Sequence, residues 1–147
     1  MDLKYMRRAL KEAQKAMEKD EVPVGCVIVL DGVIIARAHN KKETNNNPLG
    51  HAEMIAIQKA TKKLGDWRLK DCEMYVTLEP CLMCCGALIQ SRIKKVYYGA
   101  KDEKGGGVES LAYTFEIQGL NHYVNYEGGI MEKECQNLLS NYFKSKR

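Results

Sequence analysis

Three cysteines, Cys81, Cys84 and Cys85, lie within five positions of the stretch TLEPCLMCCGAL at residues 77–88. This cluster constrains the fold more than any other feature of the sequence. Cysteines grouped so closely in a reducing compartment indicate metal binding or chemical reactivity rather than a disulfide framework. The chain must therefore fold so that further ligands meet this stretch.

The chain has 147 residues, of which 45% are hydrophobic. That is enough to bury one core of ordinary size and too little to suggest two, so we expect a single domain over residues 1–147. A formal net charge of +4 permits a polyanionic partner without requiring one.

The N-terminal stretch MDLKYMRR lacks the apolar segment of a secretory signal. Elsewhere, no apolar run approaches the roughly 18 residues of a membrane span. We therefore expect a cytoplasmic protein with reduced thiols and no membrane partner. The three isolated cysteines are predicted to be small buried hydrophobic residues: Cys26, Cys72 and Cys135.

Hydrophobic periodicity and turn residues divide the chain into alternating helices and strands. The pair Asp31-Gly32 is the strongest hairpin signal, and Asp2 can cap the first helix. In chain order the sequence predicts a helix ending near Lys19, strands over 22–30 and 33–39, a loop over 40–50, a helix over 51–65, a strand over 73–78, a helix opened by Pro80, a strand over 94–99, an ambiguous piece over 111–115, a strand over 124–127 and a helix from 130. This order implies an α/β fold with a mixed sheet of about five strands and helices on both faces.

The fragments HAE at 51–53 and PCLMC at 80–84 together fit a catalytic zinc site. Such a site uses three protein ligands and leaves the fourth position for water. Helix positions i and i+3 share a face at a rise of about 4.5 Å, which suits two zinc-bound sulfurs about 3.8 Å apart. Cys81 and Cys84 meet this spacing better than Cys81 and Cys85, and His51 completes the set.

Glu53 is predicted to be the general base. Residues two apart on a regular helix point in nearly opposite directions, so His51 and Glu53 can share a site only at a helix start. Pro48 and Gly50 place His51 there. One neutral histidine and two thiolates leave Zn²⁺ formally neutral and a weak activator of water, so a nearby carboxylate is needed to take the proton.

Three other interpretations of the cluster remain open. A structural zinc site could recruit Cys85 as a fourth ligand, although only with a distorted backbone. A redox CxxC pair would need a thioredoxin-like context and would leave HAE without a role. In the third interpretation, the cysteines cluster by chance and His51 merely caps its helix.

HxE followed by PCxxC is the signature of the zinc-dependent nucleobase and nucleoside deaminases, which the chain resembles over nearly its whole length. Further stretches resemble the branch that acts on tRNA: EVPVG at 21–25, ARAHN at 36–40, WRL at 67–69, SRI at 91–93, YGAKDEKGG at 98–106 and LNH at 120–122. The resemblance implies a three-layer cytidine-deaminase-like fold and a homodimer.

The resemblance also implies the chemistry. His51, Cys81 and Cys84 would hold one Zn²⁺ per subunit, and Glu53 would shuttle protons. Zinc-bound hydroxide would attack C6 of adenine, N1 would be protonated, and ammonia would leave to give inosine. The substrate of relatives is the wobble adenosine of an arginine tRNA, extruded from the anticodon stem-loop.

Six positions match substrate contacts of that branch. Asn40 corresponds to a contact with the flipped base, although by spacing alone it is a strand-ending turn residue. Val22 and Pro48 match positions in the pocket wall, although both could simply be packing residues. Asp102, Lys104 and Asn121 match loop positions that contact neighbouring nucleotides, although each could simply be a solvated loop residue. A surface for phosphates would come from basic residues: Lys101, Lys104, Lys144, Lys146 and Arg147. Tyr142 could meet the RNA or belong to the core.

Three features depart from the pattern: Cys85 stands where relatives often carry alanine, Leu49-Gly50 precedes HAE, and Glu109 replaces a frequent glycine. None belongs to the zinc set, and we expect Cys85 to be a buried thiol. Two rival functions remain: a free nucleobase deaminase of the guanine or cytosine type, and a non-catalytic zinc-stabilised RNA-binding module.

Overall fold

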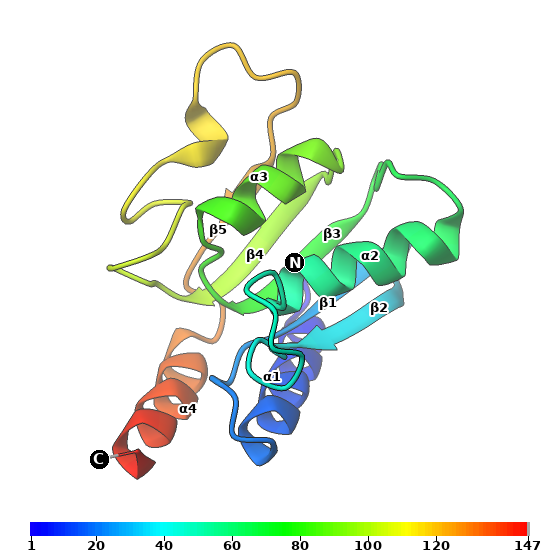
Figure 1. The fold of residues 1–147 in the computed structure, drawn as a ribbon. Helices are drawn as coiled ribbons and strands as arrows, with labels where there is room; N and C mark the ends of the chain where they lie inside the picture. The colour runs from blue at the N-terminus through cyan, green and yellow to red at the C-terminus, as the bar shows by residue number, and fades with distance from the viewer. Residues whose placement is uncertain (147) are drawn as a thin grey trace.

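A mixed sheet of five strands, covered by helices on both faces, organises the computed structural model, which describes residues 1–146 (Figure 1). In chain order the elements are α1 (Leu3–Glu18), β1 (Gly25–Leu30), β2 (Val33–His39), α2 (Ala52–Leu64), β3 (Glu73–Leu78), α3 (Leu82–Gln90), β4 (Lys95–Ala100), the 3₁₀ helix η1 (Thr114–Glu116), β5 (Asn125–Glu127) and α4 (Glu132–Ser145). The predicted α/β architecture is confirmed.

The strand order β2-β1-β3-β4-β5 combines both kinds of pairing. β1 is antiparallel to β2 and β3, whereas β3, β4 and β5 run parallel. Side chains alternate between the faces of a strand. Accordingly, Cys26 and Ile28 of β1 pack in the cluster under α2 and α3, and Val27 and Val29 pack in the cluster with α1 and α4.

Local sequence signals explain several element ends. Asp31 and Gly32 both have positive φ, +50° and +76°, as the predicted two-residue hairpin turn requires. Asp2 caps α1 by accepting a hydrogen bond from the Lys4 amide at 3.0 Å. Gly25 is required by close packing, because an added Cβ would lie 2.2 Å from the Ala9 carbonyl oxygen of α1.

Some predicted boundaries were wrong. β1 begins at Gly25 rather than residue 22, because the Val24 amide turns back to the Val22 carbonyl at 2.9 Å. The last helix begins at Glu132 rather than 130, because Met131 has a left-handed φ of +53°. The piece at 111–115, which the sequence left ambiguous, overlaps the 3₁₀ helix η1 at Thr114 and Phe115.

The isolated cysteines Cys26, Cys72 and Cys135 are buried free thiols, as predicted. Among residues 1–146, no helix combines the length and apolar character that crossing a membrane requires.

One edge of the sheet gathers the ends of several strands. β3 and β4 finish there, and β1 begins there because it is antiparallel to β3. The Thr77 hydroxyl accepts a hydrogen bond from the Gly25 amide at 3.1 Å, which ties β1 to β3 at this edge. In α/β sheets, ligands bind outside the carboxyl ends of parallel strands, so this edge is where a site is expected.

Candidate active site

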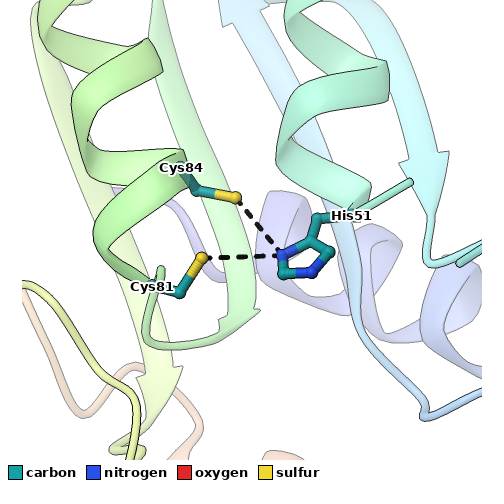
Figure 2. Close-up of side chains that lie close together, drawn as sticks. All are labelled: His51, Cys81 and Cys84. Carbon is teal, nitrogen blue, oxygen red and sulfur yellow. Dashed lines mark hydrogen bonds between the residues drawn. The ribbon is translucent and has the colours of Figure 1, made fainter. Parts of the chain in front are cut away.

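Two helix starts face each other at this edge of the sheet. His51 is the N-cap of α2 and Cys81 the N-cap of α3, and both have extended backbone, with φ and ψ of −76° and 148° and of −77° and 176°. Neither side chain caps its own helix, so both are free to point between the helices. Figure 2 shows them pointing toward each other, together with Cys84 from the first turn of α3.

The three side chains have the spacing of metal ligands. His51 Nδ1 lies 3.6 Å from the Sγ atoms of both Cys81 and Cys84. All three ligand atoms lie within 4.8 Å of one another. Ordinary zinc–nitrogen and zinc–sulfur bonds in a tetrahedral site place nitrogen and sulfur about 3.6 Å apart. One imidazole nitrogen and two sulfurs therefore fit a three-ligand zinc site with one open position.

The placement of Cys81 corrects one step of the sequence argument. Pro80 was expected to open the helix and Cys81 to lie in its first turn, whereas α3 begins at Leu82. An isolated bridge between Cys81 and Gly106 holds Cys81 in extended conformation outside the helix. Cys85 is buried, and its thiol donates to the Pro80 carbonyl at 3.6 Å, apart from the three-residue cluster.

Glu53 lies in the first turn of α2, two residues after His51, and is only 4% exposed. Burial raises its pKa from 4.5 to about 7, with a further rise from nearby Cys81 and an opposing effect of its own backbone amide. A carboxylate with a pKa near neutrality can both accept and return a proton.

Cys81 has the opposite electrostatic behaviour. Hydrogen bonds from Cys84 and His51 lower its pKa to about 4, although burial opposes them. A thiolate beside an imidazole at the start of a helix is a ready metal ligand, because the helix N-terminus favours negative charge.

A cavity of about 190 Å³ adjoins these residues and joins several segments that are distant in sequence. Val22 and Asn40, from the chain before β1 and after β2, line it together with Asp102, which follows β4. The Asn40 amide group donates to the Val22 carbonyl at 3.2 Å, and its oxygen accepts from the Lys42 amide at 3.0 Å. The structure thus brings three of the six predicted substrate-contact residues to the metal cluster and Glu53.

A larger groove of about 660 Å³ adjoins the cavity, with Val22, Leu78 and Asp102 lining both. It runs between the segment after β4 and α4. Three predicted basic residues line it: Lys101, Lys104 and Lys144. Phe143, half exposed, lines it too, whereas Tyr142 is buried and its hydroxyl donates to the Asp20 carbonyl at 3.3 Å. Tyr142 is therefore a packing residue.

Two predicted residues lie away from the cavity. Pro48, in the loop before α2, and Asn121, in the loop before β5, are exposed and line neither the cavity nor the groove. Their substrate contacts remain predictions. Arg147 lies outside the described residues.

Sequence reasoning gave no role to two buried carboxylates beside the cavity. Glu21 is 1% exposed and accepts hydrogen bonds from the Glu43 and Thr44 amides at 3.1 and 2.5 Å. Glu79 is 2% exposed and accepts four hydrogen bonds from residues 102–110. The available signal was position, since Glu79 directly follows a buried strand at the edge where the site forms.

Glu109 turns its carboxylate toward Tyr98, whose hydroxyl donates to it at 2.5 Å, while its amide donates to Glu79. The departure from glycine at this position is thereby absorbed by contacts within the fold.

A family model described as MafB19-like deaminase matches residues 1–147. The tRNA-specific adenosine deaminase of Bacillus subtilis (strain 168) is 49% identical to this chain over 143 residues, which cover 97% of this chain and 89% of the relative.

Two solved structures are similar as well. One, from a study of A-to-I editing by tRNA:A34 deaminases at the wobble position, superposes with a TM-score of 0.91 at 43% identity, covering 94% of this chain and all of the other. A guanine deaminase of Bacillus subtilis gives a TM-score of 0.65 at 42% identity, covering 69% of this chain and 66% of the other. Similarity to the first structure extends over more of the chain.

Proposed function

The chain belongs to the MafB19-like deaminase family, and we propose that it deaminates adenosine to inosine at the wobble position of a tRNA anticodon. Relatives named tRNA-specific adenosine deaminases match nearly all of the chain. The observation that carries the proposal is the His51, Cys81 and Cys84 cluster beside buried Glu53, in a cavity that adjoins a lysine-lined groove.

His51 Nδ1 and the sulfurs of Cys81 and Cys84 would hold one Zn²⁺. When bound, Zn²⁺ supplies Lewis acidity that lowers the pKa of water and so makes a nucleophile available near neutral pH. The two cysteines would bind as thiolates. The pKa of Cys81 is already lowered, whereas the hydrogen bond to Cys81 and burial raise the pKa of Cys84, so Cys84 would lose its proton only on metal binding.

Glu53 would move the protons. Its carboxylate would accept a proton from the attacking water and pass it to N1 of adenine. It would then carry the second proton from the new C6 hydroxyl to the amino group, so that the C–N bond breaks, ammonia leaves and the C6 carbonyl of inosine forms. Burial supports this role, because it removes the competing solvent and raises the pKa of Glu53 toward the working range.

Substrate binding would use the remaining walls. Asn40 and Val22 would contact the flipped base, Asp102 its neighbouring nucleotide, and the groove lysines the phosphates. Single-stranded RNA loops are recognised through extruded bases and a cationic surface, which this combination provides. Substrate contacts of Pro48 and Asn121 would follow from the resemblance alone, because both residues lie away from the cavity and the groove.

Some parts of the proposal follow from the resemblance alone. These are the preference for an arginine tRNA, a homodimeric assembly and a cytoplasmic location, where tRNA is modified. Residues 1–147 would form one catalytic domain, which is supported by the participation of strands from both halves of the chain in one sheet.

The test gives the zinc-loaded protein two kinds of substrate, an anticodon stem-loop and free nucleobases, and compares their deamination. We expect inosine in an anticodon stem-loop that carries a wobble adenosine, and no comparable ammonia release from free guanine or cytosine. A matched stem-loop with guanosine at the wobble position serves as control.

Rapid turnover of guanine, with the stem-loop left unmodified, would overturn the RNA assignment. It would favour a nucleobase deaminase, and one of the similar structures is a guanine deaminase. Tight binding of the stem-loop without any inosine would instead favour a zinc-stabilised RNA-binding module.

A further inference from the structure

Glu79 is a buried carboxylate that directly follows β3, and it is surrounded by hydrogen-bond donors. One of its oxygens accepts from the Asp102 amide at 3.1 Å and from the Ser110 hydroxyl at 2.6 Å. The other accepts from the amides of Val108 and Glu109 at 3.0 and 2.8 Å. Both oxygens of this buried carboxylate are therefore fully engaged by donors from the protein.

All four donors belong to one segment, residues 102–110, which we name the β4 loop. The loop closes tightly over Glu79, since a Cβ added to Gly106 would lie 2.3 Å from the Glu79 carboxyl carbon. A glycine is therefore required at this point of the loop. The β4 loop therefore folds around the Glu79 carboxylate, which binds four of its hydrogen-bond donors.

The β4 loop carries two of the proposed substrate contacts. Asp102 lines both the cavity and the groove, and Lys104 lines the groove. The Asp102 amide is fixed by Glu79, and the Asp102 side chain in turn accepts from the amides of Lys104 and Gly105 at 3.3 and 3.1 Å. The chain of contacts from Glu79 through Asp102 to Lys104 therefore sets the position of both residues.

We propose that Glu79 is a positioning residue that fixes the β4 loop, so that Asp102 and Lys104 meet the nucleotides flanking the target adenosine. The inference rests on the proposed function for its substrate. It assigns Glu79 to substrate binding rather than to proton transfer or metal binding, because its oxygens are taken up by donors of the loop.

A purely structural alternative must be separated from this proposal. Glu79 is two residues before Cys81, and the Gly107 amide donates to the Pro80 carbonyl at 2.7 Å. Glu79 could thus support the metal ligand instead of the loop. The two roles differ in what they change: loss of loop position weakens RNA binding, whereas loss of support for Cys81 lowers metal content.

Glu79→Gln is the direct test, because it keeps the size of the side chain and places an NH₂ group where only acceptors fit. We expect zinc content to stay at the wild-type level. We expect KM for the stem-loop to rise about tenfold with kcat changed less than about threefold, the size of roughly one lost buried hydrogen bond.

Hydrogen exchange gives a readout that does not depend on catalysis. The amides of Asp102, Val108 and Glu109 should exchange about tenfold faster in Glu79→Gln, while residues 41–46 stay unchanged. Glu12→Gln is the matched control: Glu12 is also buried, at 4% exposed, but contacts Lys15 and His39 instead of the β4 loop. It should alter neither KM nor exchange in the β4 loop.

Ser110→Ala is a milder variant, which removes a single donor from Glu79 and should raise KM a few-fold without loss of zinc. An unchanged KM in both Glu79→Gln and Ser110→Ala, or zinc loss in Glu79→Gln, would overturn the inference. If the wild type itself leaves the stem-loop unmodified, the proposed function fails, and the exchange rates still report whether Glu79 fixes the loop.

Discussion

Glu53 and Glu79 line the same cavity and are both almost fully buried, yet their pKa values move in opposite directions. Burial dominates at Glu53 and raises its pKa to about 7. Four hydrogen-bond donors outweigh burial at Glu79 and lower its pKa. We propose that the first carboxylate carries a proton, whereas the donors around the second favour its anion.

The difference divides the cavity into two walls. One wall, which would hold the proposed Zn²⁺ and is called the metal wall, consists of the starts of α2 and α3 with His51, Glu53, Cys81 and Cys84. The loop wall consists of two segments: the β4 loop, which Glu79 holds, and the segment after β2, in which Glu21 holds the amides of Glu43 and Thr44. Burial alone does not make a carboxylate reactive; the number of donors around it decides.

The largest expected effect concerns the metal wall. Cys84→Ala removes one of three ligands and should abolish zinc binding at stoichiometric zinc, and deamination with it. Cys85→Ala is the matched control at the adjacent position and should keep both, because Cys85 donates only to the Pro80 carbonyl. Metal content by atomic emission, measured beside inosine formation, checks the pair.

Retained zinc in Cys84→Ala together with zinc loss in Cys85→Ala would mean that the metal wall uses the other cysteine. Zinc loss in both variants would instead indicate a four-ligand structural site.

A second test uses the opposite pKa shifts. In metal-free protein, Glu53 has a folded-state pKa raised above its ordinary value of 4.5, so the stability it contributes is present below that value and lost as pH rises toward 7. Relative to Glu53→Gln, the wild type should lose about 3 kcal/mol of unfolding free energy between pH 4 and pH 8. Chemical denaturation across this range measures it.

Glu79 should behave in the reverse manner. Its folded-state pKa is lowered, so its contribution is present above 4.5 and is lost as pH falls through the folded-state value. The stability advantage of wild type over Glu79→Gln should therefore shrink in acid and stay constant above about pH 6. If the stability difference between wild type and variant changed with pH in the same direction for Glu53→Gln and Glu79→Gln, the distinction between the two walls would be wrong.

Much of the metal wall could be predicted from sequence, because its residues are close together in two short motifs. The spacing of Cys81 and Cys84 and the turn residues before His51 were sufficient. The predicted start of α3 was wrong, because the bridge from Gly106 that holds Cys81 outside the helix comes from a distant loop.

The loop wall could not be predicted in the same way. Glu79 meets donors 23 to 31 positions later in the chain, and Glu21 meets donors 22 and 23 positions later. Such pairings depend on the sheet edge that gathers the strand ends, and no local pattern encodes them. The five strands, in contrast, followed from periodicity, with errors confined to their ends.

The smallest expected effect is at Glu21. Glu21→Gln should raise KM for the stem-loop about two- to threefold, because it disturbs the amides of Glu43 and Thr44, and these residues line neither the cavity nor the groove. Hydrogen exchange at Glu43 and Thr44 should quicken without change at residues 102–110. A larger KM effect than that of Glu79→Gln would reverse the ranking of the two loops.

The most direct test of the account is Glu53→Gln in zinc-loaded protein, measured by single-turnover inosine formation on the stem-loop. We predict full zinc content, unchanged stem-loop affinity and a rate about a thousandfold lower, as loss of a general base entails. A rate near that of the wild type, with zinc still bound, would contradict the assignment of proton transfer to Glu53.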